Sequence, residues 1–241
     1  MDFYTKLAAQ KSEWSVIETL GTGLKVGAEE TIARALALRC LEIPVGEFVE
    51  QASKKELPLS DSGYVLLKSN IQDEEKHDRQ LESLTKSIGL TTEEHAKKAE
   101  QFLRGWLDLD DHPLVKAMVI ERSIFFVLLP ILRNYGNSSA RTVARDISGD
   151  EQVHVAFNTH VCKELGLTYS KKADRLRREI VAWFTAPLKV ENDNRGMQFW
   201  MDQSTSLLEQ GVAPELSFTR ATTIVSFFEF ANTRLTTYVN S

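Results

Sequence analysis

Apolar and polar positions alternate with the period of an α-helix along almost the whole chain. Runs of β-branched residues with a period of two, which would indicate strands, are absent. Glycines, prolines and capping residues divide the pattern into segments, and the expected helices span residues 2–24 (one helix or a pair), 26–43, 61–88, 91–107, 113–133, 138–165, 170–185, 194–210 and 214–238. Pro44 should end or kink the second helix, ahead of a connector with a short helix near 46–53.

Three of these helices carry an apolar stripe that acidic residues interrupt. The positions before and after each interruption are apolar at helical spacing, so the interrupting side chains face the same buried seam. They are Glu74 and His77 in 61–88, Glu121 in 113–133, and Glu151 and His154 in 138–165. A buried carboxylate is costly unless a partner neutralises its charge. A seam that holds several of them therefore needs cations.

The same residues form a repeated motif, because E-x-x-H occurs at 74–77 and again at 151–154. Positions i and i+3 share a helix face, so each copy aims a carboxylate and an imidazole at one point. One copy is close to chance in a chain with this many glutamates. Two copies, with Glu121 between them and a further glutamate before them, are typical of the two-metal site of a helical bundle. Carboxylates combined with imidazoles suit iron or manganese.

The first carboxylate of the set has several candidates. Glu42 is favoured because it continues the apolar stripe of 26–43 and lies far enough before Glu74 for two antiparallel helices to bring the pair level. Glu29 and Glu30 are the alternatives if the helix stops early at Pro44. For any one glutamate the alternative is a solvated side chain or a surface ion pair, and for the whole set it is a structural bundle without metal.

Composition narrows the class of protein. The net charge of −5, with acidic and basic residues interspersed, argues against a general nucleic-acid binder, which would show a basic face. Cys40 and Cys162 lack metal or disulfide spacing and are expected to be buried, reduced thiols of a cytoplasmic protein. Residues 1–12 are polar and unlike a signal peptide. No stretch approaches the ~20 apolar residues of a membrane span, and no linker divides the chain, so residues 1–241 are expected to form one domain.

These motifs resemble the ferritin-like diiron-carboxylate superfamily, and most of all the small subunit of class I ribonucleotide reductase and its related oxidases. Residues 120–126 are similar to the third-ligand helix of that family and 144–154 to its fourth, whereas Leu41 and Glu42 match the first-ligand region more loosely. The resemblance spans roughly residues 38–165. It implies an all-α fold, a ferritin-like four-helix bundle core with additional helices. The ligands that it implies are Glu42, Glu74, His77, Glu121, Glu151 and His154. Asp150 fills the position of an aspartate that hydrogen-bonds a ligating histidine.

The sequence also departs from the reductase subunit. That subunit carries a radical tyrosine one helical turn after the first ligating histidine, and here the position is Leu81. No tail bearing a tyrosine for docking a large subunit is evident, although Tyr238 lies near the end. The compact length is more similar to stand-alone oxidases and oxygenases of the superfamily.

The expected function is therefore oxygen activation by two iron ions (Fe/Fe, or Mn/Fe) that oxidises a small organic substrate. An external donor would supply electrons. The expected catalytic carboxylates are Glu74, Glu121 and Glu151. An apolar wall would shelter the reaction and shape the substrate pocket. It consists of Leu81, Phe125, Leu129 and Phe157. The alternatives are a reductase-type subunit working in a complex and a ferroxidase or iron-storage protein, and the extra helices after residue 170 count against the last. A homodimer is expected because related bundles pair through their first helices. His95, His112 and His160 are expected to be surface or rim residues.

Overall fold

The computed structural model describes residues 2–55 and 57–212, and within them every regular element is a helix. The predicted helix at 214–238 lies outside the described residues. The helices are α1 (Phe3–Ala8), α2 (Glu29–Ala37), η1 (Leu38–Leu41), α3 (Glu42–Ser53), α4 (Asp61–Ile88), α5 (Glu93–Leu107), α6 (Pro113–Ile120), η2 (Glu121–Phe125), α7 (Phe126–Tyr135), α8 (Ser138–Glu164), α9 (Lys171–Thr185) and α10 (Met197–Val212). None of the described helices is long and apolar enough to cross a membrane.

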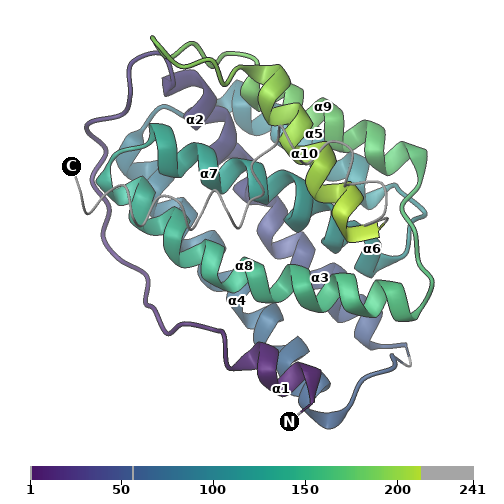
Figure 1. Cartoon of the computed structure of the whole chain (residues 1–241). Coiled ribbons are helices and arrows are strands. Elements are labelled where there is room, and N and C mark those ends of the chain that lie inside the picture. Colours follow the sequence, from purple (N-terminus) through teal and green to yellow (C-terminus); the bar gives the residue numbers. More distant parts are fainter. Residues whose placement is uncertain (1, 56, 213–241) are drawn as a thin grey trace.

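Four helical columns form the centre of the molecule (Figure 1). They are α3, α4, the continuous run α6–η2–α7, and α8, and each packs on its neighbours. One continuous apolar core joins them to the other helices. Among these, α2, α5 and α9 pack together beside the bundle, and α10 lies across η2 and α9. The all-α, ferritin-like architecture predicted from the sequence is confirmed.

The caps at the helix ends explain why the long helices begin and end where the sequence predicts. Ser60 accepts the amide hydrogen of Gly63 at the start of α4, and Gly89 ends that helix in the left-handed region with φ of 69°. Asn137 caps α8 in the same manner as Ser60. Thr92 begins α5 in a reciprocal capping box with His95. His95, expected to be a surface or rim residue, is largely buried and lies at the edge of a surface cavity.

The N-terminal prediction is also wrong, since 2–24 is not one long helix or a pair. Only Phe3–Ala8 is helical, and residues 11–25 run without regular structure along the outside of α4 and α8 (Figure 1). Side chains of the bundle replace the missing helical hydrogen bonds: Gln80 bonds both backbone groups of Ile17. Gly21 lies so close to the Ser87 carbonyl that no side chain would fit there. We call residues 11–25 the strap.

Two helix interruptions differ from the pattern. The break in the second helix falls at the 3-10 turn η1 and not at Pro44, which is the third residue of α3. Amides in the first turn of a helix have no partner within it, so a proline there removes nothing. The predicted helix 113–133 is interrupted by η2, a π-helical turn that begins at Glu121. Such turns are rare in proteins overall, and those that occur are often found at functional sites.

Candidate metal centre

The two E-x-x-H motifs meet in the middle of the bundle. Glu74 and His77 project from α4, and Glu151 and His154 project from α8, one helical turn apart in each case. Each residue offers a ligand atom, and these four atoms all lie within 4.8 Å of one another. All four side chains are buried, at 2% exposure or less. The apolar stripes therefore bring two carboxylates and two imidazoles to one point, away from water.

Glu42 and Glu121 lie on either side of this group. Glu42 Oε2 is 3.6 Å from the Nδ1 atom of His77, and Glu121 Oε1 is 3.9 Å from the Nδ1 atom of His154. Glu42 starts α3 and Glu121 starts the π turn, so each stands at a point where the helix geometry changes. Asn158, one turn beyond His154 on α8, donates to Glu121 Oε2 at 2.7 Å.

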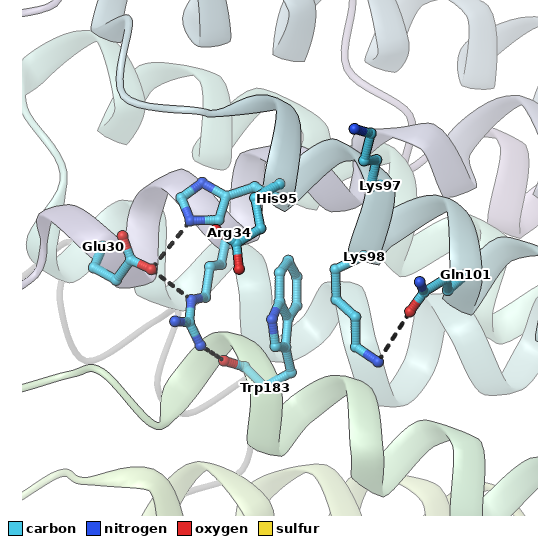
Figure 2. Close-up of a pocket in the computed structure, with 8 residues that line it drawn as sticks. Glu30, Arg34, His95, Lys97, Lys98, Gln101 and Trp183 are labelled. Carbon is cyan, nitrogen blue, oxygen red and sulfur yellow. Dashed lines mark hydrogen bonds and ion pairs between the residues drawn. The ribbon is translucent and has the colours of Figure 1, made fainter.

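The alternative first carboxylates are engaged elsewhere. Glu29 accepts the amide hydrogen of Gly27. Glu30 bonds Arg34 and His95 at the edge of a surface cavity beside Trp183 (Figure 2). Of the three candidates, Glu42 alone has its carboxylate among the buried group.

The polar atoms that point into the centre of the bundle indicate whether these residues can bind a metal. Both carboxylate oxygens of Glu42 and Glu151, Oε2 of Glu74 and the Nδ1 atoms of both histidines are buried without a hydrogen-bond partner. They approach one another closely, as with His77 Nδ1 and Glu151 Oε1 at 3.3 Å, but not in hydrogen-bond geometry. Buried polar atoms normally have partners, and leaving them without one costs free energy. The donor set, oxygen and imidazole nitrogen, is the one that iron and manganese prefer. The residues present fit a metal centre.

Without a bound metal, the charges of the cluster compensate one another through protons. Burial raises the pKa of Glu42, Glu121 and Glu151, and neighbouring carboxylates raise it further. Burial acts in the same direction on Glu74, but its contacts with the two histidines outweigh burial and lower its pKa to about 2. Burial opposes a charged His154, yet Asp73 and Glu74 raise its pKa to about 10. Without metal, the imidazoles thus favour the protonated form, and their positive charge offsets part of the negative charge of the buried carboxylates.

The outer nitrogen of each histidine contacts an aspartate from the other motif. His77 Nε2 on α4 lies 3.3 Å from Asp150 Oδ2 on α8, and His154 Nε2 on α8 lies 3.2 Å from Asp73 Oδ2 on α4. Such a partner fixes the tautomer and the ring orientation of a ligating histidine. Sequence reasoning singled out Asp150 and missed Asp73. The signal was available, because an aspartate precedes the glutamate in both motifs, giving D-E-x-x-H twice.

A cavity of about 790 Å³ lies directly outside these aspartates, between the strap, α4 and α8. Lys76 Nζ bridges the two carboxylates, at 3.2 Å from Asp73 Oδ1 and 3.2 Å from Asp150 Oδ2. Trp14, from the strap, donates its indole hydrogen to Asp150 Oδ2 at 2.8 Å, and its ring lies parallel to that of His77. Lys11 bonds Asp73 from the same side. Sequence reasoning missed Trp14 because the expected N-terminal helix would have placed it differently.

The predicted apolar wall is buried in the core. Its residues follow the proposed ligands along the same columns: Leu81 on α4, Phe125 and Leu129 on η2 and α7, and Phe157 on α8. Each is at 1% exposure or less, and none lines the cavity outside the aspartates. A substrate pocket against this wall stays a prediction. Cys162 is buried and Cys40 partly so, and both are free thiols.

The fold and the site together define a ferritin-like helical bundle with a buried carboxylate–histidine centre. A crystal structure from Bacillus halodurans, provisionally described as a class I ribonucleotide reductase, matches this chain with a TM-score of 0.60 and 16% sequence identity. The match covers 88% of this chain and 93% of that one. At this identity the likeness establishes the fold, and it is the fold that the motifs predict. No family model and no curated protein matches the sequence.

Proposed function

We propose that the chain is an oxidoreductase that holds two iron ions (Mn/Fe being the alternative pair) and uses dioxygen to oxidise a small organic substrate. The observation that carries the proposal is the convergence of buried carboxylate and imidazole atoms that have no other partner. Six residues would hold the metals, namely Glu42, Glu74, His77, Glu121, Glu151 and His154. Four carboxylates and two divalent ions sum to zero formal charge, which removes the electrostatic cost of the buried seam.

When bound by these six residues, the two metal ions would supply the reduction of dioxygen. The protein contributes the arrangement around them. Asp73 and Asp150 orient the imidazoles through their Nε2 atoms and so keep both Nδ1 atoms directed inward. The surrounding core excludes water, which protects the reaction from side reactions with solvent. The carboxylate of Glu121 is steadied by the amide of Asn158.

Electrons from an external donor would enter along the contact between Trp14, Asp150 and His77. The indole N–H bonds Asp150, which contacts His77 Nε2, and the two rings are 6.0 Å apart between centroids. Trp14 also lines the cavity outside the aspartates. Trp14 and Asp150 therefore connect the cavity outside the aspartates with the imidazole of His77.

A second candidate function is a subunit of a reductase-type complex. The likeness to the Bacillus halodurans protein favours it, as does the outward contact through Trp14. Against it stands Leu81, which occupies the position of the radical tyrosine in the reductase subunit that the sequence resembles. A lasting tyrosyl radical signal in electron paramagnetic resonance, after iron loading and oxygen exposure, would favour the complex over the stand-alone enzyme.

The experiment is anaerobic loading with ferrous iron, elemental analysis after desalting, and an absorbance trace on mixing with oxygen. We expect about two irons per chain and a transient coloured species. The double variant Glu121→Ala and Glu151→Ala should lose both. Glu75→Ala, a change at an exposed glutamate next to Glu74, is the matched control and should keep both. Metal binding that survives in the double variant would remove the proposed site. Iron oxidation that accumulates ferric mineral would favour the ferroxidase instead.

A further inference from the structure

The helices outside the four-column core contain a fully buried arginine that the proposed chemistry does not use. Arg177, on α9, is at 0% exposure. Its Nε and Nη2 atoms donate to Asp174 Oδ1 at 3.0 and 2.6 Å, and its Nη1 atom donates to Ser204 Oγ on α10 at 2.6 Å. A buried guanidinium is costly unless it is paired and fully hydrogen-bonded, so its presence requires a reason.

The hydrogen-bond chain continues into the metal centre's own helix. Ser204 Oγ, which accepts from Arg177, donates to the carbonyl oxygen of Ser123 at 2.6 Å. Ser123 lies inside the π turn η2, two residues after Glu121. Ser204 and Ser123 are both at 0% exposure, so no water competes for these bonds. The charge on Arg177 polarises the serine hydroxyl and strengthens its bond to the carbonyl.

A second anchor ties the residue directly after Glu121 to the same helix. Arg122 Nε donates to the carbonyl oxygen of Leu207 on α10 at 2.6 Å. Its guanidinium lies against Gly211, where an added Cβ would come within 2.6 Å of Nε. The two residues that follow Glu121 are therefore both hydrogen-bonded to α10, one through its side chain and one through its carbonyl group.

A π turn departs from the regular i to i−4 ladder, and side chains that insert into such a departure stabilise it. Ser204 occupies that role here. From these contacts we infer that Asp174, Arg177 and Ser204 form a positioning chain that fixes the π turn and, through it, the carboxylate of Glu121. The inference deepens the proposed function and rests on it, because positioning Glu121 has consequences only if that residue binds metal.

The test is Ser204→Ala, which deletes the hydroxyl that links Arg177 to the carbonyl oxygen of Ser123 in the π turn. Its matched control is Ser206→Ala, a buried serine on the same helix whose hydroxyl accepts from Gln210, also on α10. Both changes remove one buried hydroxyl, and Ser204→Ala should lower the melting temperature more, because it also leaves Arg177 and the Ser123 carbonyl with one hydrogen bond fewer. We expect Ser204→Ala to weaken binding of one of two Co²⁺ ions about tenfold and to change the visible Co²⁺ absorption bands. Ser206→Ala should do neither.

Asp174→Asn provides a second route if Ser204→Ala does not fold. Asp174 is at the partly exposed end of the chain, with a side-chain exposure of 22%, and an asparagine there keeps an oxygen that can accept from Arg177 while it removes the charge. It loosens Arg177 without touching η2, and we expect a weakening of Co²⁺ binding of about threefold, in line with an effect passed through an intermediate. Unchanged Co²⁺ affinity and spectrum in folded Asp174→Asn and Ser204→Ala would overturn the inference. A wild-type chain that binds no Co²⁺ would instead contradict the proposed function itself.

Discussion

The two D-E-x-x-H motifs have the same residues but different surroundings. On α8, Asp150 is almost fully buried, with a side-chain exposure of 1%, and it meets Trp14 and Lys76 as well as His77. On α4, Asp73 has a side-chain exposure of 13% and meets Lys11 and Lys76 as well as His154. Each motif supplies one glutamate and one histidine to the buried group, and contacts with the strap make the surroundings of the two aspartates unequal. We therefore expect both glutamate–histidine pairs to bind metal, and we expect the aspartates that hold their imidazoles to differ in effect.

The largest effect should come from the inner carboxylates. Glu74→Ala and Glu151→Ala each remove a carboxylate that no neighbouring side chain replaces, so each should lower iron affinity by about a hundredfold or more, the upper end of what supporting residues alone cost. Equilibrium competition with a coloured chelator measures this. A large loss is expected in both variants because each motif supplies one carboxylate to the same buried group. A loss in one variant only would show that the two motifs do not share one centre.

Substitutions of the two aspartates that contact the imidazoles should lower metal affinity by different amounts. Asp150→Asn and Asp73→Asn both disturb the orientation of an imidazole, which typically costs 10–100-fold in metal affinity. We expect the larger loss with Asp150→Asn, because the buried carboxylate also holds Trp14 and is less screened by water. The same chelator competition measures both variants. If Asp73→Asn costs as much or more, the strap does not distinguish the two aspartates.

Metal binding should depend on pH with a definite sign. Without metal, the pKa of His154 is raised to about 10 and that of His77 is raised above its usual value, so both hold a proton at pH 7. A metal can bind their Nδ1 atoms only after displacing these protons, so affinity falls as pH falls, by about tenfold per unit for each proton released. Titration calorimetry in buffers of different ionisation enthalpy counts the protons. A pH-independent affinity between 6 and 8 would contradict the assignment of the imidazoles.

A smaller effect should appear in stability without metal. Glu42 has two buried oxygens with no partner, whereas Glu121 has the amide of Asn158. Glu42→Met should therefore stabilise the metal-free chain by about 1–3 kcal/mol, the cost of burying a polar group without a hydrogen-bond partner. Glu121→Gln should change stability less. Urea unfolding in the presence of a chelator measures both free energies. Destabilisation by Glu42→Met would mean that the carboxylate has a structural partner.

The long helices and the inward carboxylates were predictable because both follow from periodicity. Glu74, His77, Glu151 and His154 interrupt apolar stripes at helical spacing, and such stripes have to pack inward in a bundle. The strap was not predictable from its own residues. Its conformation is set by hydrogen bonds from α4 and α8, as at Gln80, and such tertiary contacts override local helical preference. The π turn depends in the same way on Ser204, which is 81 residues away along the chain.

Anomalous X-ray scattering at the iron edge, from crystals grown after anaerobic iron loading, would locate the iron ions within the bundle. The account predicts two peaks within ~4 Å of each other, enclosed by α3, α4, η2 and α8 and bounded by the Nδ1 atoms of His77 and His154. An absence of iron between those helices, with the six side chains still packed against one another, would contradict it.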